Sequence, residues 1–310
     1  MPEYEGGRLD VSGVAPVRQR PGKHKRKRLL ADLQVVLLAL VVLAALVVAG
    51  WFLLSRLGGE ATGQIHSGQS DKITAVDVGT DKGHPNDSRE LEPGAAEKLD
   101  YIHAHPELYP QRLVELAEGN HETIDFVYRY PELGGTHQEI DLSGEVQAGE
   151  VPLLMQWDTR WGYEEYGDGL MCYTGCGPTC LSMAAIYLTG NTKITPLAVA
   201  EYSEGSGYYF DGTGTAWLLM SEGCEGFGLR SEEISLHDTY FYRALDQGKV
   251  IVCAMGPGDF TDEGHFIVIS GYAGEKFVVR DPNSIYNSTR LWSFEELEGQ
   301  IKGVWALRKR

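Results

Sequence analysis

The chain has 310 residues with 44 acidic and 27 basic side chains, which gives a formal net charge of −17. This acidic excess argues against nucleic acid and anionic polymers as partners, because like charges repel. Five cysteines in so long a chain exclude a small disulfide-stapled scaffold, since the chain can bury hydrophobic cores of its own. An odd number of cysteines leaves at least one thiol unpaired.

The first predicted element is a single membrane-spanning helix at residues 29–56. Every residue from 35 to 54 is apolar or glycine, which matches one bilayer crossing. The apolar core of a cleaved signal peptide is shorter, about 7–15 residues, and no small-x-small cleavage pattern follows this run. Seven basic residues lie just before the run and only Arg56 lies close behind it. We therefore expect the basic tail 1–28 to be cytoplasmic and the C-terminal part to be extracellular.

Charge and composition change after this helix. Residues 1–56 hold nine basic and four acidic side chains, whereas residues 57–310 hold 18 basic and 40 acidic ones. Residues 57–93 are rich in glycine, serine, aspartate and threonine, which predicts a flexible linker. The acidic remainder is compatible with basic peptides as partners, or simply with a solvated acidic surface.

A short helical segment with a connector is predicted over residues 94–150. Apolar residues recur at helical spacing between Ala95 and Tyr130, and two prolines interrupt the pattern, so we expect two or three short helices. Asn120 begins an Asn-His-Glu-Thr sequence that is typical of a capped helix start. We expect these helices to pack against the following domain as a support, with residues 132–150 as the connector.

Residues 151–310 are predicted to form one α+β domain. The predicted helices lie at 180–188, 196–202, 216–222, 240–246 and 294–297, and the predicted strands at 151–155, 250–255, 266–272, 276–280 and 304–307. Helices first and strands later favour a two-lobed fold with a cleft between the lobes. The glycine-rich stretch 205–215 lacks the Gly-Lys-Ser/Thr step of a phosphate-binding loop.

Cys176 is the candidate nucleophile. It lies between two glycines just before a predicted helix, where unpaired backbone N–H groups and the helix dipole favour a thiolate. Pro178 suits the first turn of that helix, and the glycines would let the backbone approach a substrate closely. Cys180, one turn further on among apolar residues, is expected to be a buried structural cysteine. The Cys172, Cys176 and Cys180 spacing is only a weak metal signature without a nearby histidine, so we expect no metal and no other cofactor.

His265 is the candidate general base, because a histidine brought to the thiol would complete an activated nucleophile. It precedes an apolar strand, and a hairpin centred near residue 273 would place it opposite Asp281. A carboxylate there would orient the imidazole and stabilise its charged form. Asn283 could serve instead, and an ordinary Asp-Pro-Asn surface turn is the other interpretation. We favour Asp281.

Gln156 is the candidate oxyanion donor. Its side-chain N–H2, beside the backbone N–H of the nucleophile, would stabilise the negative charge that develops on a carbonyl oxygen. A solvated polar residue at a strand end is the alternative interpretation.

Taken together, these residues resemble bacterial papain-like cysteine peptidases of family 39 type, which are related to bacteriocin-processing peptidases. The resemblance covers about residues 150–308 and rests on Gln-Trp-Asp-Thr-Arg-Trp (156–161), Gly-Cys-Gly-Pro-Thr (175–179), Gly-His-Phe (264–266) and Asp-Pro-Asn (281–283). It implies a papain-like fold, a helical lobe plus an antiparallel sheet, with Cys176 as nucleophile, His265 as base and Asp281 as orienting acid. Gln156 lies farther before Cys176 than in papain-like enzymes generally.

The sequence therefore predicts a membrane-anchored extracellular cysteine peptidase of a bacterium, which hydrolyses peptide bonds through a Cys-His-Asp triad and an acyl-enzyme. Two other functions stay open. One is a catalytically silent peptide-binding module of the same fold, and the other is a thiol amidase or acyl-transferase acting on cell-wall peptides. The expected partners are a peptide or protein substrate and the membrane, without nucleic acid, and we expect a monomer.

Overall fold

A computed structural model of the protein describes residues 91–310. The predicted cytoplasmic tail (1–28), the predicted transmembrane helix (29–56) and nearly all of the predicted linker (57–93) lie outside the described residues. Within the described part, no helix is both long enough and apolar enough to cross a membrane.

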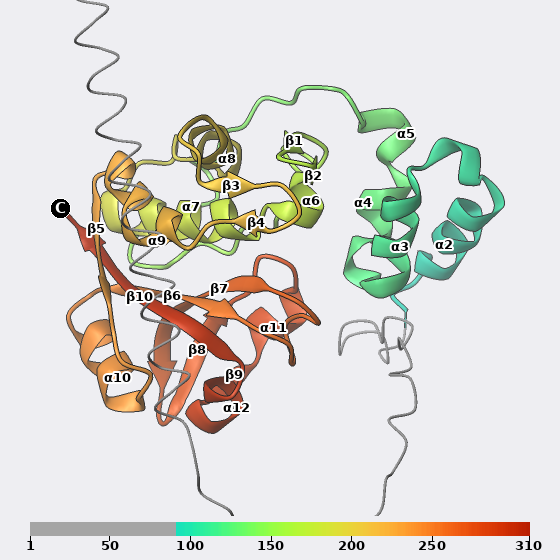
Figure 1. The fold of residues 1–310 in the computed structure, drawn as a ribbon. Helices are drawn as coiled ribbons and strands as arrows, with labels where there is room; N and C mark the ends of the chain where they lie inside the picture. Colours follow the sequence, from blue (N-terminus) through green and yellow to red (C-terminus); the bar gives the residue numbers. More distant parts are fainter. Residues whose placement is uncertain (1–90) are drawn as a thin grey trace, which may run out of the picture. The chain divides into compact units, whose positions relative to one another are not determined.

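Short helices make up the N-terminal part of the described chain (Figure 1). They are α2 (Ala95–Ala104), α3 (Gln111–Gly119), α4 (Ile124–Tyr128) and α5 (Tyr130–Leu133), with 3-10 turns at Pro106–Leu108 and His121–Thr123. Their apolar side chains, Ile102, Leu113 and Val127 among them, form a hydrophobic cluster that also contains Tyr163 and Cys172 from the following domain. The helical segment thus shares a core with that domain.

The following domain is built on a six-stranded antiparallel sheet with strand order β5-β10-β6-β7-β8-β9. Its strands are β5 (Leu229–Glu233), β6 (Val250–Met255), β7 (His265–Ala273), β8 (Lys276–Arg280), β9 (Leu291–Ser293) and β10 (Ile301–Lys309). Two small ribbons pair β1 (Glu165–Tyr166) with β2 (Gly169–Leu170) and β3 (Tyr209–Phe210) with β4 (Gly214–Thr215).

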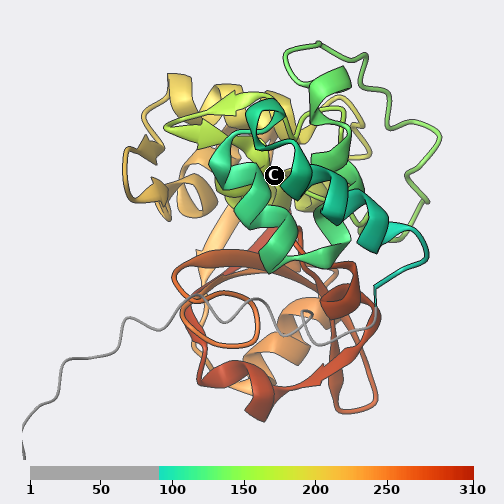
Figure 2. The same cartoon turned by 90° about the vertical axis from the view of Figure 1, so that its right-hand side faces the viewer.

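Helices cover both faces of this sheet. Those that contact it are α7 (Cys176–Thr189), α9 (Leu218–Ser221), α10 (Asp238–Asp246), α11 (Ile285–Thr289) and α12 (Phe294–Glu298). Helices α6 (Met171–Thr174) and α8 (Pro196–Gly205) pack against α7. Helices α7 and α8 form a layer separate from the sheet in both ribbon views (Figure 1, Figure 2). The described domain therefore has the expected α+β architecture of helices and an antiparallel sheet.

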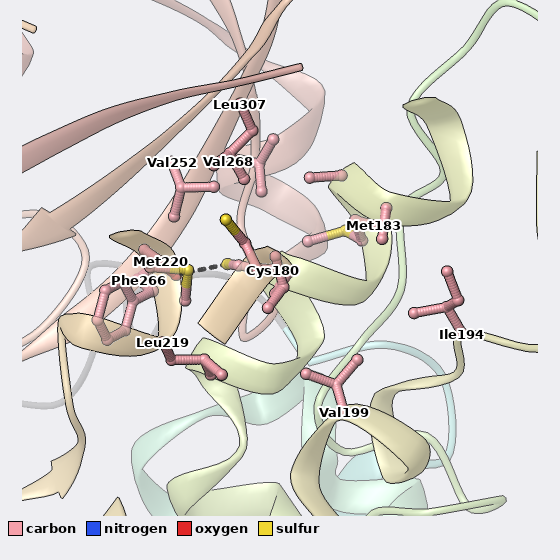
Figure 3. Packing of buried hydrophobic residues seen from close by; sticks show 14 of the residues in the cluster. Cys180, Met183, Ile194, Val199, Leu219, Met220, Val252, Phe266, Val268 and Leu307 are labelled. Carbon is pink, nitrogen blue, oxygen red and sulfur yellow. Dashed lines mark hydrogen bonds between the residues drawn. The ribbon is translucent and has the colours of Figure 1, made fainter. Parts of the chain in front are cut away.

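Two cores result from the alternation of side chains along the strands. Val252 and Val268 share one core with the residues of α7, α8 and α9, whereas Ile251 and Ile267 share the other with α10 and α12. Figure 3 shows Cys180 of α7 lying close to the strand residues of the first core. Because apolar side chains cover both faces, every residue of β6 is buried.

The local sequence pattern predicted the central strands of the sheet and α7 well, and the edge strands poorly. Strands β6 and β8 have the predicted bounds, and α7 starts four residues earlier than expected, at Cys176. The strand predicted at 151–155 is wrong, because this stretch pairs with no other strand. Its backbone makes isolated hydrogen bonds instead of a strand ladder. The N–H of Leu154, for example, donates to the sulfur of Met183. Strands β5 and β9, which were not predicted, are the two edge strands. Polar side chains hide the pattern of β5, and the three residues of β9 are too few to show a period.

The β7–β8 hairpin is shifted from the predicted register. Val268 pairs with Arg280, so the same register continued by one residue would place Asp281 opposite Ile267 rather than His265. A shift of two residues keeps a side chain on the same face of the sheet, whereas a shift of one would move it to the other face. His265 and Asp281 are therefore diagonal neighbours on one face.

Candidate active site

Cys176 is the first residue of the 14-residue helix α7, and Gly175 is its N-cap. The first N–H groups of a helix have no partner within it, and together with the helix dipole they favour negative charge. All five cysteines of the chain are free, and Cys176 is the one whose side chain is not buried. The accessible thiol therefore lies where a thiolate is stabilised.

The glycines beside Cys176 serve close packing within the protein. A Cβ added to Gly177 would lie 2.7 Å from Cγ2 of Thr215, and one added to Gly175 would lie 2.4 Å from the carbonyl oxygen of Met171. Both distances are shorter than the contacts that Cβ atoms make with non-bonded atoms in proteins. These glycines therefore have a packing role, and the expectation that they also let the backbone approach a substrate stays a prediction.

The other four cysteines are buried, and burial raises the pKa of each of their thiols, that of Cys224 to about 11. The thiol of Cys180 donates to the carbonyl oxygen of Phe266 at 3.2 Å, which ties α7 to β7 beside His265. Cys180 is thus a structural residue. Within residues 91–310, no three His, Cys, Asp or Glu side chains are grouped so that they could hold a metal ion.

His265 connects Cys176 to Asp281. Its Nε2 lies 2.8 Å from Oδ1 of Asp281, and the two side chains are only 6% and 0% exposed. Cys176 lies close enough to the same imidazole to help raise its pKa. Because Asp281 occupies Nε2, Nδ1 is the ring nitrogen left for the thiol. The structure thus brings these three predicted residues together in one row, Cys176, His265 and Asp281.

The charged forms of His265 and Asp281 stabilise each other. Burial alone would lower the pKa of His265, but the charge and hydrogen bond of Asp281, together with Cys176, raise it to about 10. Burial alone would raise the pKa of Asp281, but His265 and the donors from Asn287 and Asn283 hold it below its usual range. At neutral pH the pair is therefore an imidazolium and a carboxylate.

Asp281 is held by donors that the sequence did not reveal. The Asn287 side chain donates to Oδ2 at 2.9 Å, and the backbone N–H of Asn283 donates to Oδ1 at 2.9 Å. The backbone N–H of Asp281 itself donates to the Ser288 hydroxyl at 2.8 Å. Asn287 is 1% exposed, and it lies in a stretch where no periodicity predicted an element. Asn283, the alternative orienting residue, thus supports Asp281 through its backbone.

Gln156 is buried between the two halves of the site. Its backbone N–H donates to the carbonyl oxygen of Pro282 at 2.7 Å, and its side-chain Nε2 donates to that of Cys172 at 2.7 Å. The residue is 3% exposed, so the interpretation as a solvated polar residue is wrong. One of its two amide hydrogens is taken up by the carbonyl oxygen of Cys172.

A family model and several solved structures match this chain. The peptidase domain of Streptococcus ComA, a bifunctional ABC transporter involved in a quorum-sensing pathway, is 19% identical, with 44% of this chain and 93% of that one covered at a TM-score of 0.36. A structure described as a C39-like peptidase from Bacillus anthracis is 15% identical, with 56% and 98% covered at a TM-score of 0.35. No curated protein matches the chain. The model of the Peptidase_C39-like family matches residues 149–310, just over half of the sequence. The chain therefore belongs to the Peptidase_C39-like family.

Proposed function

We propose that this chain is a cysteine peptidase in which Cys176 is the nucleophile, His265 the general base and acid, and Asp281 the residue that orients the imidazole. The observation that carries the proposal is the buried, hydrogen-bonded His265–Asp281 pair next to Cys176, the one cysteine that is not buried. Membership in a peptidase-like family supports the same chemistry.

In the proposed reaction, the Cys176 sulfur attacks the carbonyl carbon of a peptide bond, and the carbonyl electron pair moves onto oxygen. The backbone N–H of Cys176 and the remaining amide hydrogen of Gln156 stabilise this oxyanion. When the oxyanion collapses, the carbon–nitrogen bond breaks and His265 gives its proton to the leaving amine. Water then attacks the thioester carbon while His265 takes one of its protons. The carbon–sulfur bond breaks, which releases the acid and restores the Cys176 thiolate beside the His265 imidazolium.

We propose in addition that residues 29–56 anchor the enzyme in a bacterial membrane, with the tail 1–28 in the cytoplasm and a monomeric peptidase domain at the cell surface. The support for this is the uninterrupted apolar run and the basic residues on one side of it. Residues 57–93 would then act as a linker between membrane and domain.

Iodoacetamide is expected to modify Cys176 at least about tenfold faster than any other cysteine of the full chain, because the other four thiols are buried. Replacing His265 with alanine should slow this modification about tenfold at mildly acidic pH, since the thiolate loses its imidazolium partner. Mass spectrometry of tryptic peptides after short exposures measures both rates.

His103→Ala is the matched control for the alkylation experiment. His103 is an exposed histidine that bonds Glu118 in the helical segment, so its removal should leave the rate at Cys176 unchanged. Equal labelling of all five cysteines, or undiminished labelling in folded His265→Ala, would contradict the proposal. Peptide binding without turnover, unchanged by Cys176→Ala, would identify a silent binding module instead. Release of muropeptides from purified cell wall would identify an amidase.

Hydrolysis is expected to persist well into the alkaline range and to decline only as the pH approaches about 10. His265 must carry a proton to protonate the leaving amine, and its pKa is raised from 6.5 to about 10. The stabilisation of the fold by the raised pKa of His265 has the same sign: it is complete below the unfolded histidine value of 6.5 and is lost as the pH rises through the folded value. At acid pH the same pair weakens, because the lowered pKa of Asp281 contributes stability only while the carboxylate is ionised. Initial rates and circular dichroism over one pH series test both effects. A decline of the rate near an ordinary histidine pKa would contradict the assignment.

A further inference from the structure

Glu122, which lies outside the region matched by the family model, caps a helix next to the proposed catalytic row. Its carboxylate accepts the backbone N–H of Ile285 at 2.6 Å and that of Tyr286 at 3.1 Å. These are the first two residues of α11. The carboxylate therefore bridges the N-terminal helical segment and the stretch that follows Asp281.

Helix α11 depends on such caps because it has only five residues. Helices this short are not stable by themselves in water. The Ser284 hydroxyl accepts the N–H of Asn287 at 3.2 Å, so Ser284 and Glu122 together satisfy the first three N–H groups of the helix. Without Glu122, the N–H groups of Ile285 and Tyr286 lose the carboxylate that joins them to the N-terminal helical segment.

Helix α11 in turn holds Asp281. The Asn287 side chain donates to Oδ2 of Asp281 at 2.9 Å, and Ser288 accepts the Asp281 N–H at 2.8 Å while it donates to the carbonyl of Ser284 at 2.8 Å. A fully buried carboxylate needs such donors, since an unpaired buried charge is costly. The position of α11 therefore sets the position of the carboxylate that faces His265.

Glu122 is itself fixed in place. Its backbone N–H donates to the Asn120 side chain at 3.1 Å, and the Thr123 hydroxyl donates to the Asn120 carbonyl at 2.7 Å. The Asn120 side chain also donates to the carbonyl of Asn283 at 2.8 Å. Asn120, which precedes the His121–Thr123 turn, and Glu122 within it thus both bond the stretch that carries Asp281.

We propose that Glu122 is a positioning residue for the active site: by capping α11 it holds Asn287, and through Asn287 it holds Asp281 against His265. The helical segment before the family domain is then a working part of the enzyme. The inference rests on the proposed roles of Cys176, His265 and Asp281. The hydrogen bonds described above connect Glu122 to α11, so its effect on those three residues runs through this helix.

The test is the pH dependence of Cys176 alkylation in the full chain. With Glu122→Gln, a less firmly held Asp281 supports the imidazolium less well, so the midpoint of alkylation is expected to move up by about one pH unit. Below the midpoint this is a rate about tenfold lower. Glu118→Gln is the matched control, because Glu118 bonds His103 within the same segment, and its profile should follow the wild type.

A double variant tests the route through α11. Asn287→Ala should raise the midpoint as Glu122→Gln does, and the two changes together should shift it no further than Asn287→Ala alone. Fully additive shifts would overturn the route. Glu122→Asp keeps the charge but is one methylene shorter, so it should shift the midpoint by less than Glu122→Gln, and it carries the test should Glu122→Gln fail to fold. Wild-type profiles in the folded Glu122 variants would overturn the inference.

This experiment is independent of hydrolysis, because alkylation needs no substrate. A chain that shows the predicted shifts but cleaves no peptide would contradict the peptidase function and leave the positioning role of Glu122 intact. A chain that cleaves peptides through Cys176 but shows no shift would do the reverse.

Discussion

Cys176→Ser is expected to abolish peptide hydrolysis while the chain stays folded. The substitution exchanges sulfur for oxygen with little change in shape at the start of α7. A serine hydroxyl is a weak nucleophile at its ordinary pKa and does not form the thiolate that pairs with His265. Loss of a nucleophile costs on the order of 10⁴-fold or more in turnover. Cleavage of a synthetic peptide library, followed by mass spectrometry, measures the loss.

Cys224→Ser is the control for the nucleophile. Cys224 is buried, and its thiol lies 3.7 Å from the carbonyl oxygen of Ser221, a contact that a hydroxyl can also make. Its replacement should change the rate by less than about threefold, because most substitutions away from a site alter stability rather than turnover. Retained hydrolysis in folded Cys176→Ser would remove Cys176 from its proposed role.

The local sequence was sufficient to place Cys176, because the signals that start a helix lie within a few residues of it. Gly175 and Pro178 flank the start of α7, where an N-cap and a first turn accept them. His265 and Asp281 were paired from a hairpin whose register is three residues off at the turn, where Ala273 pairs with Lys276. A β-bulge between Ile269 and Gly271 reduces the shift to two at Val268 and Arg280, and this even shift leaves His265 and Asp281 on one face.

The residues that the sequence did not reveal act across long separations. Glu122 bonds the N–H groups of residues 163 and 164 positions later, and no periodic pattern reports such a contact. Asn287 lies in a helix of five residues. So short a helix has too few positions to show a helical period in the sequence. The strand predicted at 151–155 failed for the opposite reason: its local pattern fits a strand, but no other strand pairs with it.

Asp281→Asn is expected to lower the rate of peptide hydrolysis about 100-fold. An opposite charge next to a titrating group shifts its pKa by about one to three units, and this substitution removes that charge from beside His265. Oδ1 of Asp281 accepts from His265 and from the N–H of Asn283, while Oδ2 accepts from Asn287. An asparagine at position 281 keeps one acceptor and turns its N–H2 toward the N–H2 of Asn287, so that two donors face each other. Without the negative charge the pKa of His265 falls, and the alkaline decline of the rate moves to lower pH.

Exchanging the two side chains tests whether the charge and the hydrogen-bond pattern are what matter. In the double variant Asp281→Asn with Asn287→Asp, the amide at position 281 can donate to a carboxylate at position 287, and a buried negative charge returns next to the residue that bonds His265. We expect the exchange to recover at least about tenfold of the loss, with the alkaline decline moving back toward higher pH. The measurement is kcat/KM over a pH series for the wild type, both single variants and the double variant. If Asp281→Asn alone left the rate and its pH dependence unchanged, Asp281 would not orient the imidazole. If the double variant were no better than Asp281→Asn, the bond from Asn287 would not be what holds the carboxylate in place.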